Sequence, residues 1–130
     1  MKQPPLANAE LAIMKLLWKK DRLTARQIRE QLYPDETKSQ HGTVQRLLQR
    51  LEDKGYINRD RSLPVHLFSA KIDSKSYAAS QLESLAAKLT GGSLAPLITS
   101  LVEDKKLSAE ELNRLRTILD ENTVKEDQHD

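Results

Sequence analysis

The fold is decided by the stretch Gln40-His41-Gly42-Thr43-Val44-Gln45-Arg46-Leu47-Leu48-Gln49-Arg50-Leu51-Glu52-Asp53-Lys54-Gly55-Tyr56-Ile57. Its apolar residues recur at spacings of three and four, which places them in one stripe on a helix: Val44, Leu47, Leu48 and Leu51. Gly55 can adopt the left-handed conformation that ends a helix. The stretch therefore predicts an amphipathic helix with the stripe buried.

The opposite face of this helix carries polar and guanidinium groups, namely Thr43, Gln45, Arg46, Gln49 and Arg50. Such groups can reach the phosphates and base edges of DNA. The same pattern also fits any surface helix whose polar face is solvated. The helix alone leaves both interpretations open, so the sequence segments on either side of it are needed to choose between them.

The composition predicts a soluble globular protein of one or two small domains, with 130 residues, 38% of them hydrophobic and 31% charged. No apolar run approaches the roughly 20 residues that span a bilayer, so we expect no membrane insertion. Glu10 and Lys15 interrupt the apolar region near the N-terminus, which argues against a signal peptide. The chain has no cysteine, hence no disulfide and no thiolate metal site. We expect a cytoplasmic protein without a cofactor.

The net charge of +2 is unevenly distributed. Residues 1–72 hold 14 Lys and Arg against 8 Asp and Glu, whereas residues 73–130 hold 7 against 11. The basic part contains the amphipathic helix. This asymmetry supports a polyanionic partner for the first part of the chain only.

Two helices are predicted before the central one. Residues 1–7 include two prolines and are expected to form a loose arm, after which Asn8 caps a helix over residues 9–19 in which Trp18 belongs to the core. Thr24 at the N-cap and Gln27 three residues later form a capping box for a second helix, which Pro34 ends at residue 32 or 33. Polar residues 35–39 then connect it to the central helix, as in a helix-turn-helix.

A β-hairpin is predicted after Gly55, from residues 56–61 and 65–68 separated by Ser62-Leu63-Pro64. Three helices followed by a hairpin make a winged helix. Arg59 and Arg61 fall near the predicted hairpin tip, where a wing lies along the DNA backbone or in the minor groove. Together with Arg46 and Arg50 they define one basic edge, which favours DNA binding.

The rest of the chain is predicted to be helical. Ala78, Leu82, Leu85 and Leu89 are spaced as in a heptad seam, and Gly91-Gly92 ends that helix. Ser93 is expected to cap a second helix with Pro96 in its first turn. Ser108 and Glu111 form the capping box of a third, beyond which residues 123–130 are expected to be a polar, frayed tail.

These helices carry more leucines than about 50 residues can bury alone, which suggests pairing with a second copy of the chain. We therefore predict a mainly α protein, with a winged-helix DNA-binding domain over residues 1–72 and a three-helix dimerisation domain over residues 73–122. The dimerising residues are Ala78, Leu82, Leu85, Leu89, Leu97, Leu101, Leu112, Leu115 and Leu119. A two-fold dimer would present two recognition helices to a pseudo-palindromic site in double-stranded DNA. The alternative is that the helices fold back onto the winged helix of the same chain.

Three segments resemble the penicillinase repressor family, which includes the methicillin-resistance and copper-responsive repressors. They are residues 11–18, residues 43–57 and residues 107–112, and the resemblance covers nearly the whole chain. It implies a homodimeric winged-helix repressor that binds dyad operators. Thr43, Arg46 and Arg50 fall where family members touch operator DNA, with Gln40 and Gln45 nearby. Gly42 replaces a lysine of some relatives, and Leu63-Pro64 stands where a wing glycine is usual.

The resemblance also bears on regulation. In resistance-linked members a membrane-bound sensor peptidase triggers cleavage of an Asn-Phe bond, which makes a regulatory peptidase a conceivable partner here. The matching pair in this chain is Ser100-Leu101, so the family bond is absent. The cysteine-rich metal site of copper-responsive members is absent as well, and the inducer stays open.

Catalysis finds no support in the sequence. His41, His66 and His129 are scattered, and no paired carboxylates or glycine-rich phosphate loop is present. Two alternatives to a repressor remain: a winged helix that binds other proteins, and a winged-helix regulator that senses a small molecule.

Overall fold

The computed structural model describes residues 4–35 and 39–127, with side chains as far as residue 122. The predicted arm residues 1–3, turn residues 36–38 and tail residues 128–130, with His129, lie outside the described part. Contacts divide the chain into two compact units, Met1–Leu82 and Glu83–Asp130. This division falls inside α4 (Ser74–Leu89), whereas the functional boundary at residue 72 stays a prediction.

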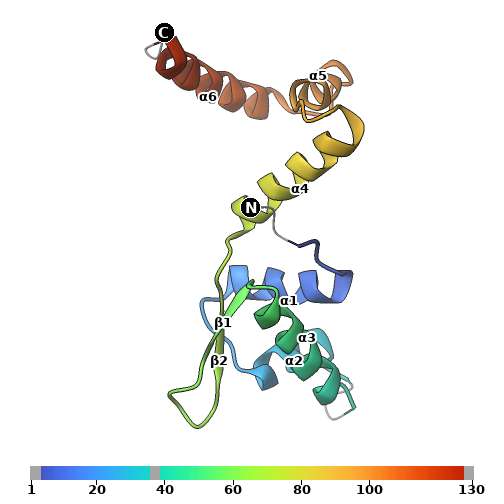
Figure 1. Cartoon of the computed structure of the whole chain (residues 1–130), viewed down its shortest axis with the longest axis vertical. Helices are drawn as coiled ribbons and strands as arrows, with labels where there is room; N and C mark the ends of the chain where they lie inside the picture. Colours follow the sequence, from blue (N-terminus) through green and yellow to red (C-terminus); the bar gives the residue numbers. More distant parts are fainter. Residues whose placement is uncertain (1–3, 36–38, 128–130) are drawn as a thin grey trace. The chain divides into compact units, whose positions relative to one another are not determined.

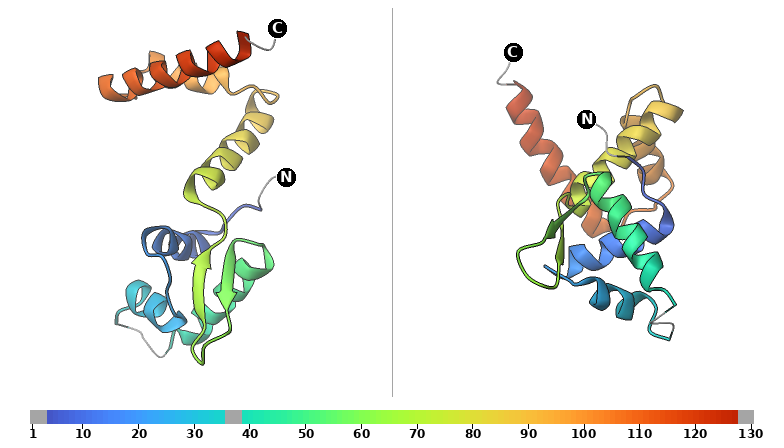
Figure 2. Two further views of the ribbon diagram at one scale, coloured as in Figure 1. Left: turned by 90° about the vertical axis from the view of Figure 1, so that its left-hand side faces the viewer. Right: turned by 60° about the horizontal axis from the view of Figure 1, so that its bottom comes forward.

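The first unit contains three helices and a hairpin, as the sequence predicts (Figure 1). These elements are α1 (Asn8–Lys19), α2 (Ala25–Leu32), α3 (His41–Asp53), β1 (Ile57–Asp60) and β2 (Leu67–Ala70), and the first part of α4 follows them in the same unit. Figure 2 shows the three helices gathered beside the hairpin, where α1 contacts β2 and α3 contacts β1. The winged helix is confirmed, with a two-stranded antiparallel wing.

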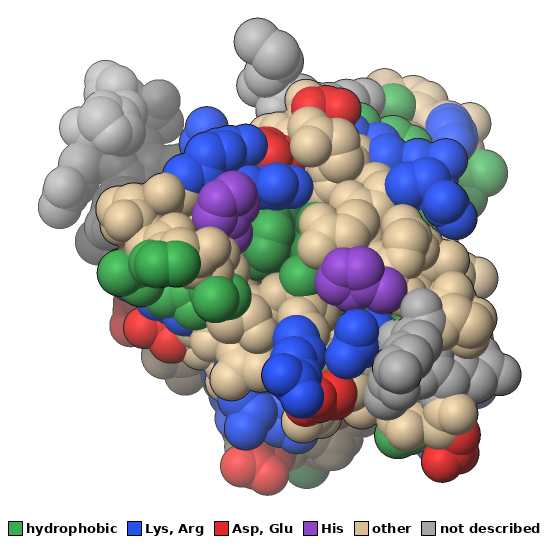
Figure 3. All heavy atoms as spheres, turned by 90° about the horizontal axis from the view of Figure 1, so that it is seen from below, with side chains coloured by type: hydrophobic (Ala, Val, Ile, Leu, Met, Phe, Trp, Pro, Cys, Tyr) green, Lys and Arg blue, Asp and Glu red, His purple; other side chains and the backbone are tan. Residues whose placement is uncertain are grey.

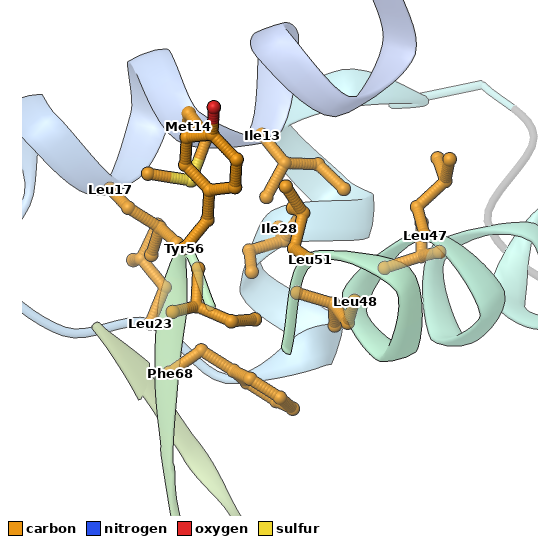
Figure 4. Packing of buried hydrophobic residues seen from close by; sticks show 12 residues of the cluster. Ile13, Met14, Leu17, Leu23, Ile28, Leu47, Leu48, Leu51, Tyr56 and Phe68 are labelled. Carbon is orange, nitrogen blue, oxygen red and sulfur yellow. The ribbon is translucent and has the colours of Figure 1, made fainter. Parts of the chain in front are cut away.

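A single apolar core joins these elements (Figure 4). The predicted stripe of α3 lies in it, because Val44, Leu47, Leu48 and Leu51 are all buried. Phe68 enters the core from β2, and Leu23 forms a backbone bridge with it through hydrogen bonds of 3.0 and 2.8 Å. The stretch between α1 and α2 therefore extends the edge of the wing, a pairing that no local pattern in the sequence announces.

The predicted helix ends are confirmed where the two residues that form the cap are close in sequence. Thr24 and Gln27 exchange the predicted capping-box hydrogen bonds, at 2.8 and 3.1 Å. Gly55 has a φ of 82°, and the helix before it ends as predicted. The expected N-cap at Asn8 is wrong: Ala7 is the N-cap, because the Glu10 carboxylate accepts a hydrogen bond from the Ala7 N–H at 2.9 Å.

The arm before α1 is fixed over residues 4–6, which corrects the expectation of a loose segment. Lys54 donates a hydrogen bond of 3.3 Å to the carbonyl of Pro5, and the Tyr56 hydroxyl donates to the carbonyl of Pro4. The Leu6 N–H donates to the hydroxyl of Tyr77 at 3.2 Å. These contacts join residues about 50 and 71 positions apart, so sequence spacing could not reveal them.

The wing differs from its prediction in the bounds of its strands. Residues Ile57–Asp60 pair with Leu67–Ala70, so the second strand starts two residues later than expected. At the end of the first strand, the Asp60 carboxylate accepts hydrogen bonds from the Ser62 N–H and hydroxyl at 2.9 and 2.6 Å, which stabilise the turn there. The loop between the strands consequently spans residues 61–66.

In the second unit the helices are α5 (Ala95–Glu103) and α6 (Ala109–Asp127), preceded by the end of α4. Gly91 and Gly92 have positive φ values of 66° and 103° and end α4 as predicted. Ser93 is not the expected cap: the N-cap of α5 is Leu94, which makes no side-chain cap hydrogen bond. The Ser108 and Glu111 capping box is confirmed, with bonds of 3.0 and 3.1 Å, and α6 continues to Asp127, past the predicted end at residue 122.

The buried Glu10 makes the stability of the first unit depend on pH. Glu10 is 1% exposed, and its Oε1 accepts a hydrogen bond from Lys54 at 2.8 Å. Burial by itself raises the pKa of Glu10, but the Lys54 and Ala7 hydrogen bonds and the charges of Lys54 and Arg50 hold the pKa below its ordinary value of 4.5. A carboxylate with a depressed folded-state pKa stabilises the fold above the unfolded-state value, and this stabilisation is lost as the pH falls through the folded-state pKa.

We therefore expect the free energy of unfolding to fall as the pH drops below about 4.5. Urea unfolding between pH 3 and 7, roughly the range in which carboxyls titrate, measures this dependence. The variant Glu10→Gln should be less stable at pH 7 and should show a flatter profile. An equally steep profile in the variant would show that other carboxyls are responsible.

Candidate nucleic-acid interface

The polar face of α3 is the centre of the candidate interface. Arg46 and Arg50 are exposed, and Thr43 and Gln45 are half-buried beside them. Gln40, the predicted contact before the helix, is half-buried and is the N-cap of α3. Since the apolar stripe is buried in the core, the opposite face of α3 must point outward. The residues predicted for that face lie on it together: Thr43, Gln45, Arg46, Gln49 and Arg50.

Side-chain contacts restrain part of this face. Arg46 Nη2 lies 3.5 Å from the Thr43 hydroxyl, at the limit of a hydrogen bond. Gln49 donates a hydrogen bond of 2.9 Å to Asp53, one turn further on. Arg29 of α2 lies 3.2 Å from Nδ1 of His41, which connects the start of α3 to the preceding helix. The exposed cations therefore stand on a helix whose start contacts α2 through polar side chains.

The two predicted wing residues lie in different environments. Arg59 is in β1, its side chain is only 13% exposed, and its guanidinium carbon lies 4.8 Å from the centre of the Phe68 ring. Arg61 is in the loop and 55% exposed. Both contact Glu52 of α3, which the sequence analysis did not single out as functional because no local pattern joins a helix-end carboxylate to a strand.

A hollow of about 270 Å³ lies where the start of α2, α3 and the wing meet. Its lining residues are Thr24, Ala25, Arg26, His41, Gln45, Arg59, Pro64, Val65, His66 and Phe68. Figure 3 shows this face, with histidine side chains on either side of hydrophobic ones and Lys and Arg side chains around them. The exposed Arg26 of α2 also lines this hollow, and the sequence analysis did not single it out.

The predicted dimerisation residues are largely accessible in the single chain. Leu82, Leu85 and Leu89 are 52%, 44% and 66% exposed along α4, and Ala78 is exposed as well. Leu101 and Leu119 are 47% and 61% exposed, whereas Leu97, Leu112 and Leu115 are half-buried. Among the described side chains after residue 82, Ala86 is the only buried apolar one. This second unit consequently lacks a core of its own.

Two apolar grooves run along α6 within the second unit. One, of about 230 Å³, is lined by Ile98, Val102, Leu112, Leu115, Arg116, Leu119 and Asp120. The other, of about 250 Å³, is lined by Leu107, Glu111, Arg114, Leu115 and Ile118. Apolar grooves beside exposed leucines are typical of an interface between chains.

Within the described ranges 4–35 and 39–127, no helix is both long and apolar enough to cross a bilayer. The same residues contain no group of three or more His, Asp or Glu side chains arranged to hold a metal ion.

Comparison with known proteins decides the family. The family model described as "Penicillinase repressor" matches residues 6–121, which is most of the chain. The chain belongs to the penicillinase repressor family. Its membership agrees with the resemblance of the three sequence segments and with the winged helix of the first unit.

Relatives within the penicillinase repressor family match over almost their full length. The penicillinase repressor of Bacillus licheniformis is 31% identical over 120 residues, covering 92% of this chain and 93% of the relative. The methicillin resistance regulatory protein MecI of Staphylococcus aureus strain N315 is 25% identical over 114 residues, covering 88% and 92%. The similarity therefore includes the helices after the wing as well as the winged helix itself.

Solved structures agree with this family assignment. The DNA-binding domain of the repressor BlaI has a TM-score of 0.50 and 32% identity, covering 59% of this chain and 94% of that domain. The complex of hsRosR-S4 has a TM-score of 0.51 and covers 94% of this chain and 93% of the other, at 16% identity. The second likeness supports the fold alone.

Proposed function

We propose that this member of the penicillinase repressor family is a DNA-binding transcriptional repressor that binds a pseudo-palindromic operator as a homodimer. The observation that carries the proposal is the geometry of α3: its apolar stripe is buried, and its outward face presents Arg46 and Arg50 beside Thr43 and Gln45. A helix of this kind fits the major groove of B-DNA. The relatives from Bacillus licheniformis and Staphylococcus aureus that are named penicillinase repressor support the same function.

Each polar group of this face has a chemistry that suits a DNA contact. Thr43 lies in the first turn of α3, where backbone N–H groups and the helix dipole favour a phosphate. Arg46 and Gln45 have planar ends that can hydrogen-bond a purine edge through two atoms. Arg50, one turn after Arg46, has a side chain long enough to contact a phosphate of the DNA backbone. We assign base recognition to Gln45 and Arg46, and phosphate binding to Thr43 and Arg50.

Homodimerisation is supported by the second unit. Exposed leucines on α4, α5 and α6 and two apolar grooves leave a large apolar surface on one chain. A second copy supplies a surface with the same chemistry, as two-fold interfaces do. Two winged-helix domains linked in a dimer bind two half-sites far more tightly than two separate domains do, because the second contact is effectively intramolecular. We place the protein in the cytoplasm, where a bacterial-type repressor meets its operators.

A mobility-shift experiment tests the function. The binding duplex is first selected from a randomised library with the purified full chain, and a scrambled duplex of the same composition is the control. We expect tight binding to the selected duplex, with an affinity that falls steeply and log-linearly as salt rises, since phosphates are neutralised on binding. Recovery of no preferred sequence, together with salt-independent binding, would favour a protein-interaction module over a repressor.

A further inference from the structure

Glu52 connects the recognition helix to the wing. Its Oε2 accepts a hydrogen bond of 2.9 Å from Nη2 of Arg61, and its Oε1 lies 3.2 Å from Nε of Arg59. The second contact is an ion pair without hydrogen-bond geometry, since neither atom has a hydrogen-bond partner. One carboxylate on α3, itself 22% exposed, therefore holds two guanidinium groups of the wing.

The two arginines differ in what else holds them. Arg59 pairs with Phe68 in the hairpin register, and its guanidinium stacks over the ring of this buried residue at 4.8 Å. A cation over an aromatic face is held more firmly when both are removed from water, as here, where Arg59 is 13% exposed. Arg59 is thus packed between Glu52 of α3 and Phe68 of β2.

Arg61 is 55% exposed and forms an ion pair with Glu52. Exposed ion pairs contribute little net stability, so a competing anion displaces such a partner at small cost. A DNA phosphate carries the charge and the acceptor oxygens that suit a guanidinium. Arg61 can exchange Glu52 for a phosphate while Arg59 keeps its place.

We infer that Glu52 is a positioning residue of the DNA interface. Together with Arg59 it fixes the wing relative to α3, and it holds Arg61 until a backbone phosphate replaces it. This inference rests on the proposed function and divides the roles of the two wing arginines: Arg61 contacts DNA, and Arg59 acts on the wing through Glu52 and Phe68.

The first test compares the two arginines by the salt dependence of binding to the selected and scrambled duplexes. The variant Arg61→Ala should lower the slope of log affinity against log salt by about 0.9, the value of one phosphate contact. The variant Arg59→Ala should leave this slope unchanged, lower the melting temperature and reduce the ratio of selected to scrambled affinity. If Arg59 only stabilised the fold, Arg59→Ala would lower the melting temperature without changing this ratio. The affinities are calculated from the concentration of binding-competent protein.

The second test removes the carboxylate charge with Glu52→Gln. The ion pair that Arg61 must break is then absent, and α3 loses its charged contact with the wing. We expect scrambled-DNA affinity to rise roughly twofold to fivefold and the selected-to-scrambled ratio to fall by a similar factor. In the double variant Glu52→Gln with Arg61→Ala, the rise on scrambled DNA should disappear.

Glu83→Gln is the matched control. It removes one exposed carboxylate, changes the net charge equally, and lies on α4, outside the first unit. Its affinities should stay close to those of the wild type. Equal behaviour of Glu52→Gln and Glu83→Gln would overturn the inference, and so would an Arg59→Ala slope that falls as far as that of Arg61→Ala. If the wild-type protein binds neither duplex, the proposed function itself fails and this inference with it.

Discussion

Leu85→Asp should convert the protein to monomers and weaken operator binding by a factor of roughly 10²–10⁴, the loss expected when two linked sites become separate. Leu85 is 44% exposed on α4 of the single chain, so an aspartate there costs the fold of one chain little. In a dimer the same position would bury a carboxylate against leucines, which is strongly unfavourable. Sedimentation should give the mass of one 14.8 kDa chain for the variant and twice that for the wild type.

Ala87→Asp is the control for this substitution. It introduces the same charge two residues away, on a different face of the same helix, at another exposed position. This variant should remain dimeric and bind the operator as the wild type does. A dimeric Leu85→Asp protein would show that the leucines of α4 do not form the interface.

Arg46→Ala should remove much of the preference for the operator. Arg46 is exposed on the face of α3 opposite the buried stripe, and a guanidinium that reads a guanine through two hydrogen bonds contributes about 1–3 kcal/mol of discrimination. We expect operator affinity to fall by roughly 5–150-fold and affinity for scrambled DNA to fall much less. Competition titrations with both duplexes at one salt concentration measure the two affinities.

Lys19→Ala serves as the control for Arg46→Ala. It removes one positive charge from the same unit, at the exposed end of α1. Its effect should be small and similar on both duplexes. Unchanged operator preference in Arg46→Ala would mean that this helix does not read the bases.

The sequence predicted those features whose partners lie within one or two helical turns. The capping boxes at Thr24 and Ser108 were recognisable because both partners are three residues apart. The buried stripe of α3 and the ends at Gly55 and Gly91 follow from helical periodicity and backbone freedom. These local rules were enough for the winged helix and for the outward face of α3.

Contacts between distant residues explain what sequence reasoning missed. The Leu23 bridge to Phe68, the arm contacts of Tyr56 and Tyr77, and the Glu52 pairs with the wing all depend on tertiary placement. Spacing along the chain carries no information on such pairs. For the same reason, the sequence grouped Arg59 and Arg61 as equals, although packing makes one largely buried and leaves the other exposed.

The central claim is that two copies of this chain, joined through their helical units, place two α3 helices on one duplex. Native mass spectrometry of the full-length protein with a selected duplex that contains both half-sites tests it most directly. The account predicts a complex of two chains and one duplex, and a single half-site duplex that binds far more weakly. One chain per full-length duplex, with equal affinity for the half-site, would contradict the account.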